Sequence, residues 1–148
     1  MPRKFDNFAD VLRSALGDRL IDEATTLELF TEDVTFEFPY APEGLPRKLV
    51  GRPALAQHFA RLAPHLEFGE LTLREVYPGE HAILFEFSCG GRGKATGAAY
   101  DQDYISVVRL REGRISHYRD YWNPLVVLSA LGGAEKAAAA FAEEATDG

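Results

Sequence analysis

The stretch YDQDYISVVRLREGRISHYRDYWNPLVVLSALGG, residues 100–133, decides the fold of this chain. It contains two β-rich runs, 104–111 and 115–122, separated by a Glu-Gly pair that is typical of a tight turn. Because the runs follow each other so closely, they predict an antiparallel hairpin. Asn123 and Pro124 come next, and they favour the N-cap and the first residue of an apolar helix that two glycines end.

The second strand of this hairpin has two faces, because side chains alternate along a strand. One face carries Ser116, Tyr118, Asp120 and Trp122, and the other carries Ile115, His117, Arg119 and Tyr121. Asp120 is the candidate for chemistry, since an apolar pocket would raise the pKa of its carboxyl and suit proton transfer near neutral pH. Three alternatives stay open for Asp120: a catalytic acid or base, a pocket carboxylate hydrogen-bonded to a tyrosine, and an exposed side chain.

The composition limits the classes of protein to consider. The chain has 148 residues, 46% of them hydrophobic, which predicts one domain with one core. Its formal net charge is −7, whereas nucleic-acid-binding proteins carry a basic face, so we expect no nucleic-acid partner. A single cysteine, Cys89, excludes an intrachain disulfide and fits a reducing compartment. The N-terminal residues lack the apolar core of a signal peptide, and no apolar run approaches the roughly 20 residues of a membrane span. We therefore expect a cytoplasmic protein that does not span a membrane.

The remaining residues predict helices first and strands later. The expected helices are residues 4–17, a short one capped by Asp22, and one that Pro53 begins; the expected strands are 34–38 and a hairpin of 66–77 with 81–89. Residues 39–52, rich in proline and glycine, are expected to form an ordered loop or lid. We therefore predict an α+β fold with helices on one face of a curved antiparallel sheet. A single domain should span 1–133, followed by a helical or frayed tail over 134–148.

Several signals of cofactor chemistry are missing from the sequence. The segment GGRGKATG, residues 90–97, lacks the Gly-Lys-Ser/Thr ending of a phosphate-binding loop and lies between strands. The four histidines and the acids lack metal-ligand spacing such as His-Glu-x-x-His. Cys89 has no near basic partner in the sequence that would activate its thiol. We therefore expect no metal and no cofactor.

Two segments, FTEDVTFEFPYAPEGLPRKLVGRPALAQHF at 30–59 and YISVVRLREGRISHYRDYWNP at 104–124, carry a family resemblance. With this element order, residues 5–132 resemble the SnoaL-like branch of the nuclear transport factor 2-like superfamily. Relatives in that superfamily include ketosteroid isomerase, limonene epoxide hydrolase and polyketide cyclases. The resemblance implies a cone-shaped, cystatin-like fold, in which a curved antiparallel sheet wraps around N-terminal helices and a deep apolar pocket. It also implies a homodimer.

The resemblance places the functional positions of these enzymes residue by residue. The base and the protonated Asp of ketosteroid isomerase fall at Phe38 and Ser106, which are not acids, so that mechanism is not expected here. The Arg and Asp pair of limonene epoxide hydrolase falls near Glu86 and Ser88, so that machinery is incomplete. The later Asp of the hydrolase matches Asp120, and polyketide cyclases similarly need one Asp on this strand.

We therefore predict a pocket protein that acts on a small apolar molecule, as a cofactor-free isomerase, cyclase or hydrolase with Asp120 as acid or base. The alternatives are a non-catalytic ligand-binding or accessory protein and a purely structural dimerisation module. The residues expected to line the pocket beside Asp120 are Phe38, Tyr40, His58, Glu86, Tyr104, Ser106, Tyr118 and Trp122. A rim position stays open for Glu86, and a surface or lid position for His58.

Two further expectations concern the surroundings of the pocket. The face that carries His117, Arg119 and Tyr121 together with Ile115 predicts the dimer contact, since interfaces are enriched in Tyr and Arg. The loop over residues 39–52 is expected to border the pocket mouth and to respond to ligand.

Overall fold

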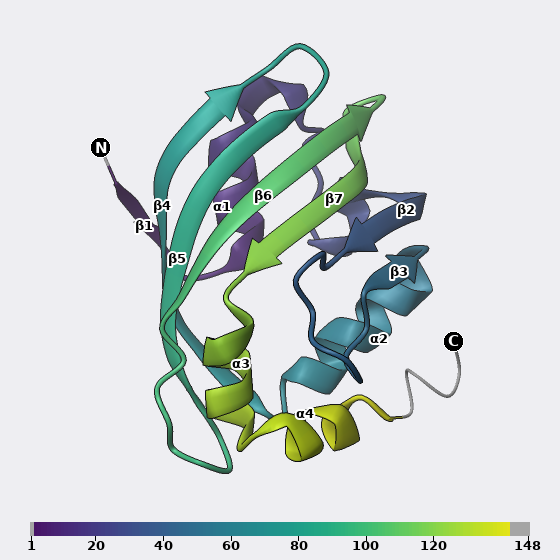
Figure 1. The fold of residues 1–148 in the computed structure, drawn as a ribbon. Coiled ribbons are helices and arrows are strands. Elements are labelled where there is room, and N and C mark those ends of the chain that lie inside the picture. The colour runs from purple at the N-terminus through teal and green to yellow at the C-terminus, as the bar shows by residue number, and fades with distance from the viewer. Residues whose placement is uncertain (1, 143–148) are drawn as a thin grey trace.

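Helices pack against one curved sheet over residues 2–142, the part of the chain that the computed structural model describes (Figure 1). The strands are β1 (Arg3–Phe5), β2 (Phe30–Glu37), β3 (Lys48–Val50), β4 (Leu66–Pro78), β5 (Ile83–Gly93), β6 (Gln102–Arg111) and β7 (Arg114–Trp122). The α-helices are α1 (Phe8–Leu16), α2 (Arg52–Leu62), α3 (Pro124–Leu131) and α4 (Ala134–Ala140). The predicted α+β class is confirmed.

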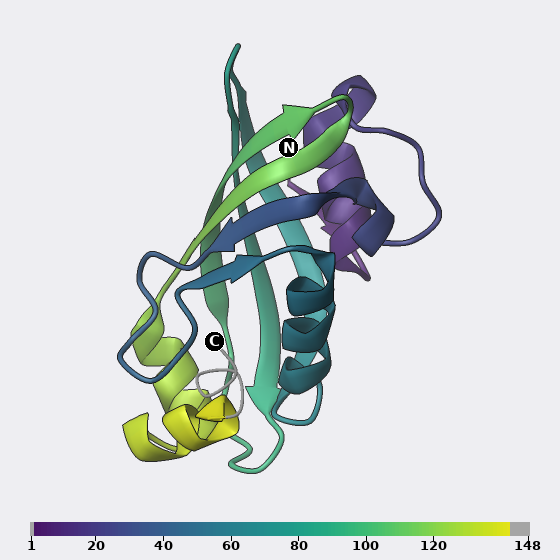
Figure 2. The same cartoon turned by 90° about the vertical axis from the view of Figure 1, so that its right-hand side faces the viewer.

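The strands of the described residues form one sheet in the order β1-β4-β5-β6-β7-β2-β3. Neighbouring strands are antiparallel except β2 and β7, which run parallel with Phe36 opposite Tyr118. We expected antiparallel pairing throughout. A parallel pair needs a long connection, and here α2 and the strands β3 to β6 supply it. Figure 2 shows the bend of the sheet, with α1 and α2 on its hollow side.

The hairpin that the sequence predicts is present as β6 and β7. Glu112 and Gly113 form its two-residue turn, and both have positive φ, at 52° and 80°, as the tightest hairpin turns require. The helix after the hairpin also begins and ends as predicted. The side chain of Asn123 accepts a hydrogen bond from the backbone N–H of Leu125 at 3.0 Å, and Gly132 ends α3 in the left-handed conformation.

A β-bulge near the start of β7 changes which side chains share a face. Leu110 pairs with Ile115, but the preceding Arg109 pairs with His117, so Ser116 is the extra residue of β7. Ile115 is therefore fully buried in the core, on the same side of the sheet as Tyr118. The prediction that Ile115 lies on the outer face was wrong, because the alternation shifts by one residue at the bulge.

The N-terminal segment is less helical than predicted. Residues 3–5 form β1, which pairs with β4, so α1 begins only at Phe8, after an Asn7 N-cap whose side chain accepts from Asp10 N. The short helix expected after Asp22 is reduced to a 3-10 turn at Leu27–Leu29, since β2 begins at the next residue. The loop over 39–52 contains the edge strand β3, which pairs with β2.

The C-terminal segment is helical as far as the structure describes it. We expected residues 134–148 to be a helical or frayed tail; the structure has α4 over Ala134–Ala140, and Phe141 after it is buried among core residues. Residues 143–148 of that expected tail lie outside the described residues.

Candidate functional site

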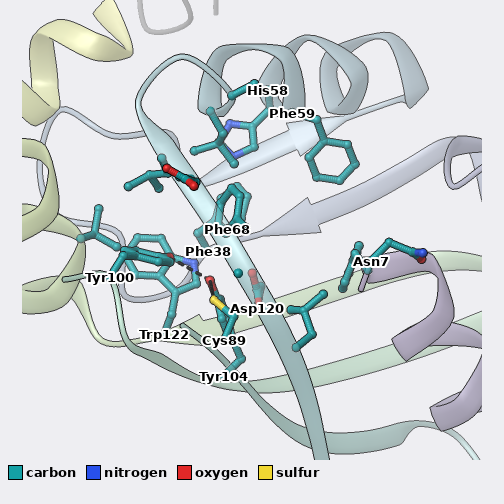
Figure 3. A pocket seen from close by; sticks show the side chains of 18 of the residues that line it. Asn7, Phe38, His58, Phe59, Phe68, Cys89, Tyr100, Tyr104, Asp120 and Trp122 are labelled. Atoms are coloured by element: carbon teal, nitrogen blue, oxygen red, sulfur yellow. Dashed lines mark hydrogen bonds between the residues drawn. The ribbon is translucent and has the colours of Figure 1, made fainter. Parts of the chain in front are cut away.

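A cavity of about 590 Å³ lies between the sheet and the helices. Its walls are largely apolar and include ten aromatic residues: Phe8, Phe36, Phe38, Phe59, Phe68, Phe87, Tyr100, Tyr104, Trp122 and Phe141. In Figure 3, His58 and Phe59 extend from α2 on one side, while Asp120, Cys89 and Tyr104 come from strands on the other. The size and the apolar walls are those of sites that bind small organic molecules.

Asp120 is an acidic residue on the side of the cavity that the strands form. It lies on β7 directly opposite Ser106 of β6, and it shares the inner face with Trp122, two residues further along the same strand. Its Oδ1 atom is buried and has no hydrogen-bond partner among the described residues. An unpaired carboxylate oxygen in such surroundings is costly, so this site favours the protonated acid.

Burial raises the pKa of Asp120 well above its ordinary range, and the nearby Ser106 hydroxyl offsets this only in part. The carboxyl therefore holds its proton to a higher pH than an exposed Asp does. A neutral carboxylic acid is a hydrogen-bond donor as well as an acceptor. It can donate to a carbonyl or epoxide oxygen of a bound molecule.

A short chain of polar hydrogens lies close to Asp120. The Cys89 thiol is 3.8 Å from the Tyr104 hydroxyl, to which it can donate, and the Tyr104 and Tyr100 hydroxyls are 2.8 Å apart. Burial raises the pKa of all three groups, that of Cys89 to about 11, so all three keep their protons near neutral pH. The thiol and the two hydroxyls carry three polar hydrogens, and the two contacts between them use two of these. The third can be donated to a molecule in the cavity.

Ser106 and Tyr118 form a second polar pair, beneath the cavity wall rather than in it. Their hydroxyls are 2.5 Å apart, and neither side chain is exposed. The Tyr118 ring stacks on Phe36, with centroids 4.4 Å apart and planes within 5°. This packing fixes the strand that carries Asp120. Ser106 and Tyr118 therefore support the wall instead of lining it.

The structure separates the expected lining residues into three groups. Asp120, Trp122, Phe38, Tyr104 and His58 lie together at the cavity, and Ser106 and Tyr118 lie behind its wall. Four of the expected residues therefore do not line the cavity: Ser106 and Tyr118 lie behind its wall, and Glu86 and Tyr40 lie outside it. The side chains of Phe85 and Phe87 point inward, so Glu86 points outward, where it accepts a hydrogen bond from the Tyr77 hydroxyl at 3.0 Å. Tyr40 is 60% exposed and packs edge-on against Tyr121.

Other lining residues were not among the predicted site residues. Cys89 continues the alternation of Phe85 and Phe87 along β5, so the same strand pattern could have placed it at the cavity. Phe141 had no comparable signal, because it is an isolated aromatic residue in an alanine-rich segment. Leu45 and Pro46 place the loop over 39–52 on the same cavity as Asp120; its response to ligand stays a prediction.

Residues 2–142 lack two further features. Within this range, no helix is long and apolar enough to cross a membrane. In the same range, His, Cys, Asp and Glu side chains do not gather anywhere in a group of three that could hold a metal ion.

Comparisons with known proteins agree with this geometry. The SnoaL-like domain model matches residues 11–118. The chain is 39% identical over 133 residues to "Uncharacterized protein YesE" of Bacillus subtilis (strain 168), covering 88% of this chain and 90% of that protein. It is similar to the crystal structure named "Putative Isomerase from Bacillus subtilis", with a TM-score of 0.72 and 38% identity over 84% of this chain and 92% of that one.

A more distant structure shows the same fold. A Catenulispora acidiphila protein with a ketosteroid isomerase-like fold is 18% identical and superposes with a TM-score of 0.61, over 86% of this chain and 89% of that one. The protein therefore has the cone-shaped nuclear transport factor 2-like fold, and the chain belongs to the SnoaL-like domain family.

Proposed function

We propose that this protein binds a small, mostly apolar molecule in the cavity and moves a proton on it with Asp120, without a cofactor. The observation that carries the proposal is the carboxyl of Asp120 at a largely apolar cavity of about 590 Å³, with Oδ1 buried without a partner among the described residues and with its pKa raised by burial. The substrate class is a carbonyl, epoxide or polyketide-like compound, because these have an oxygen that gains negative charge when the molecule isomerises, cyclises or opens.

Asp120 would serve this chemistry as a general acid first. The neutral carboxyl donates its proton to the substrate oxygen as charge develops there, and the resulting carboxylate can take a proton back from carbon or water. In the chain of Cys89, Tyr104 and Tyr100, the one polar hydrogen that makes no internal contact is available to donate to the same oxygen or to a neighbouring one. The name "Putative Isomerase" of the Bacillus subtilis structure is consistent with proton transfer of this kind.

A non-catalytic binding or accessory protein is the second candidate. The predominance of apolar over polar wall surface supports it, because such a cavity holds an apolar molecule whether or not chemistry follows. A purely structural module is not supported, since its interior would be filled with side chains.

The test compares the wild-type protein with Asp120→Asn, which keeps the shape and removes the acid. Trp122 is the single tryptophan of the chain and lies at the cavity, so its fluorescence reports ligand binding in both proteins. A panel of enones, epoxides and polyketide-like aromatic ketones is screened for binding and for turnover. If Asp120 is catalytic, the variant binds the same compounds but turns them over roughly 10²–10⁴-fold more slowly. Equal turnover in the two proteins would remove Asp120 from the mechanism, and binding without turnover in either would favour the second candidate.

We also propose a cytoplasmic homodimer that forms through the outer face of the sheet. This face carries Tyr121 and, opposite it on β6, Ile105, which is 46% exposed. Tyr40 packs on Tyr121, and His117 and Glu37 pair on the same face. An exposed apolar and aromatic centre with charged groups around it has the composition of a protein interface.

A further inference from the structure

The cavity has two ends, and different helices form them. Asp6, Asn7 and Phe8, at the start of α1, line one end, while Val127, Leu131 and Phe141, on α3 and just after α4, line the other. Figures 1 and 2 both show α1 and α4 far apart at opposite ends of the domain, and Figure 3 shows Asn7 on the side away from Trp122. Asp120 lies on the wall between the two ends.

Phe141 is the last ring of an aromatic row that starts beside Asp120. Trp122 contacts Phe38 with ring centroids 6.1 Å apart, and Phe38 contacts His58 at 5.0 Å. The Phe141 ring stacks on His58, with centroids 5.7 Å apart and planes within 20°, and it is only 2% exposed. A long molecule that binds Asp120 and extends along this row therefore meets Phe141 at its far end.

Contacts on the outside hold α4 in this place. A Cβ atom added to Gly44 would lie 2.7 Å from the Cβ atom of Ala138, so the backbone of the loop over 39–47 touches the helix directly. On the inner side, Ala137 is fully buried. The chain reaches α4 through Gly132 and Gly133, both with positive φ, which allows the sharp turn from α3 back toward the cavity.

We propose that Phe141 is a specificity-determining residue: it forms the end wall of the cavity and sets the greatest length of molecule that the site accepts. This inference rests on the proposed function, because it takes the cavity to be the substrate site. The further point is that Phe141, just after α4, limits the length of the substrate in addition to the sheet. Removal of the Phe141 ring lengthens the cavity beyond His58, and a larger ring at this position shortens the cavity.

The experiment measures dissociation constants by calorimetry for a series of n-alkyl phenyl ketones, from acetophenone to dodecanophenone. Each buried methylene is expected to tighten binding about three- to fourfold until the molecule reaches the end wall. Beyond that chain length the gain stops or reverses, because overpacking is unfavourable. The readout is the chain length at which the gain in affinity stops, called the break below. It depends on the total length of the ketone, whichever end points to Asp120.

Three full-length variants locate the wall. Phe141→Ala should move the break to longer ketones by about two methylenes or more, and Phe141→Trp should move it to shorter ones. Leu125→Ala is the matched control, because Leu125 is an apolar residue of α3 that is 72% exposed and outside the cavity lining. It should leave the break where it is.

The outcomes separate this inference from the proposed function. If the wild-type protein binds no ketone, the ligand cavity itself is wrong and this inference falls with it. If the wild type binds but the break stays in place in both Phe141 variants, only the end wall is overturned. A loss of helix packing in Phe141→Ala could lengthen the accepted ketones by itself, but it could not shorten them in Phe141→Trp. The opposite shifts of the two variants are therefore the decisive result.

Discussion

Ser106 and Asp120 are direct neighbours across β6 and β7, yet the Ser106 hydroxyl makes its short contact, 2.5 Å, with the Tyr118 hydroxyl. Oδ1 of Asp120 is buried with no hydrogen-bond partner among the described residues. A protein that needed Asp120 only as a structural acceptor would satisfy this oxygen, since buried polar atoms are normally hydrogen-bonded. An acid at the cavity wall with one unsatisfied oxygen is consistent with the acid/base role proposed above.

Asp120→Asn should leave the protein folded and as stable as wild type, or more stable, near neutral pH. The folded pKa of Asp120 is raised above its unfolded value of about 3.9. The folded state therefore binds the proton more tightly, and its stability falls as the pH rises from the unfolded pKa through the folded one. Asn has no such titration, so the variant should gain relative to wild type over that pH range. Chemical denaturation at several pH values measures the difference.

A clear loss of stability in Asp120→Asn at neutral pH would contradict this expectation. It would mark Asp120 as a structural hydrogen-bond acceptor, which was one of the alternatives that the sequence left open. Asp103→Asn is a suitable control, because Asp103 is an exposed acid of the neighbouring strand β6.

The Ser106 and Tyr118 pair should be energetically coupled. Ser106→Ala and Tyr118→Phe each leave the other hydroxyl buried without this partner, at a cost of about 1–3 kcal/mol in the free energy of unfolding. The double variant leaves neither, so its cost should be smaller than the sum of the two. Urea denaturation of all four proteins gives the coupling energy, and strict additivity would show that the short contact contributes little.

Ser106→Ala has a second expected effect, on Asp120 itself. The Ser106 hydroxyl lowers the pKa of that carboxyl, so its removal should raise the pKa further. Carbon-13 NMR of the Asp120 carboxyl follows this titration. A lower pKa in the variant would mean that water replaces the hydroxyl and hydrates the acid better.

Most of the fold could be predicted from local patterns. The Glu112-Gly113 turn and the Asn123 cap act through the backbone of a few neighbouring residues, so the sequence indicated the hairpin and α3 directly. The β-bulge at Ser116 had no such signal, because it depends on how β7 pairs with β6. The parallel pairing of β2 with β7 likewise arises only when the complete chain is folded.

The site was predictable where strand alternation decides it. Asp120 and Trp122 were placed at the cavity because they share one face of their strand, whereas Phe38 was placed by the family resemblance. Phe141 could not be found in this way, since the contact with His58 joins segments more than eighty residues apart in the sequence, and helix propensity in the alanine-rich tail says nothing about its packing. Tyr40 was misplaced for a similar reason: it follows Pro39 in a loop, where alternation ends.

The proposed dimer predicts that a charge at the centre of the outer sheet face separates the subunits. Ile105→Lys places a charge at a residue that is 46% exposed, so it should cost the monomer little stability while disrupting an apolar interface. Sedimentation velocity at micromolar concentration should show a dimer for wild type and a monomer for the variant. Leu125→Lys, at an even more exposed apolar residue of α3, should remain a dimer. A monomeric wild-type protein would refute the proposal.

The last prediction concerns the Cys89 thiol in alkali. Burial raises its pKa from 9.0 to about 11, so the folded protein keeps this proton over a pH range in which the unfolded chain loses it. Stability should therefore fall as the pH rises from about 9 toward 11, by up to about 2 kcal/mol from this group. Cys89→Ser retains a hydrogen-bond donor toward Tyr104 but does not ionise in this range, so its stability should fall less over the same pH interval. Tyr100 and Tyr104 lose their protons in the unfolded state of both proteins, so that part of the loss is common to the two. Urea denaturation at pH 8 and pH 10.5 measures the difference, and equal losses in the two proteins would mean that the thiol is better hydrated than its 5% exposure indicates.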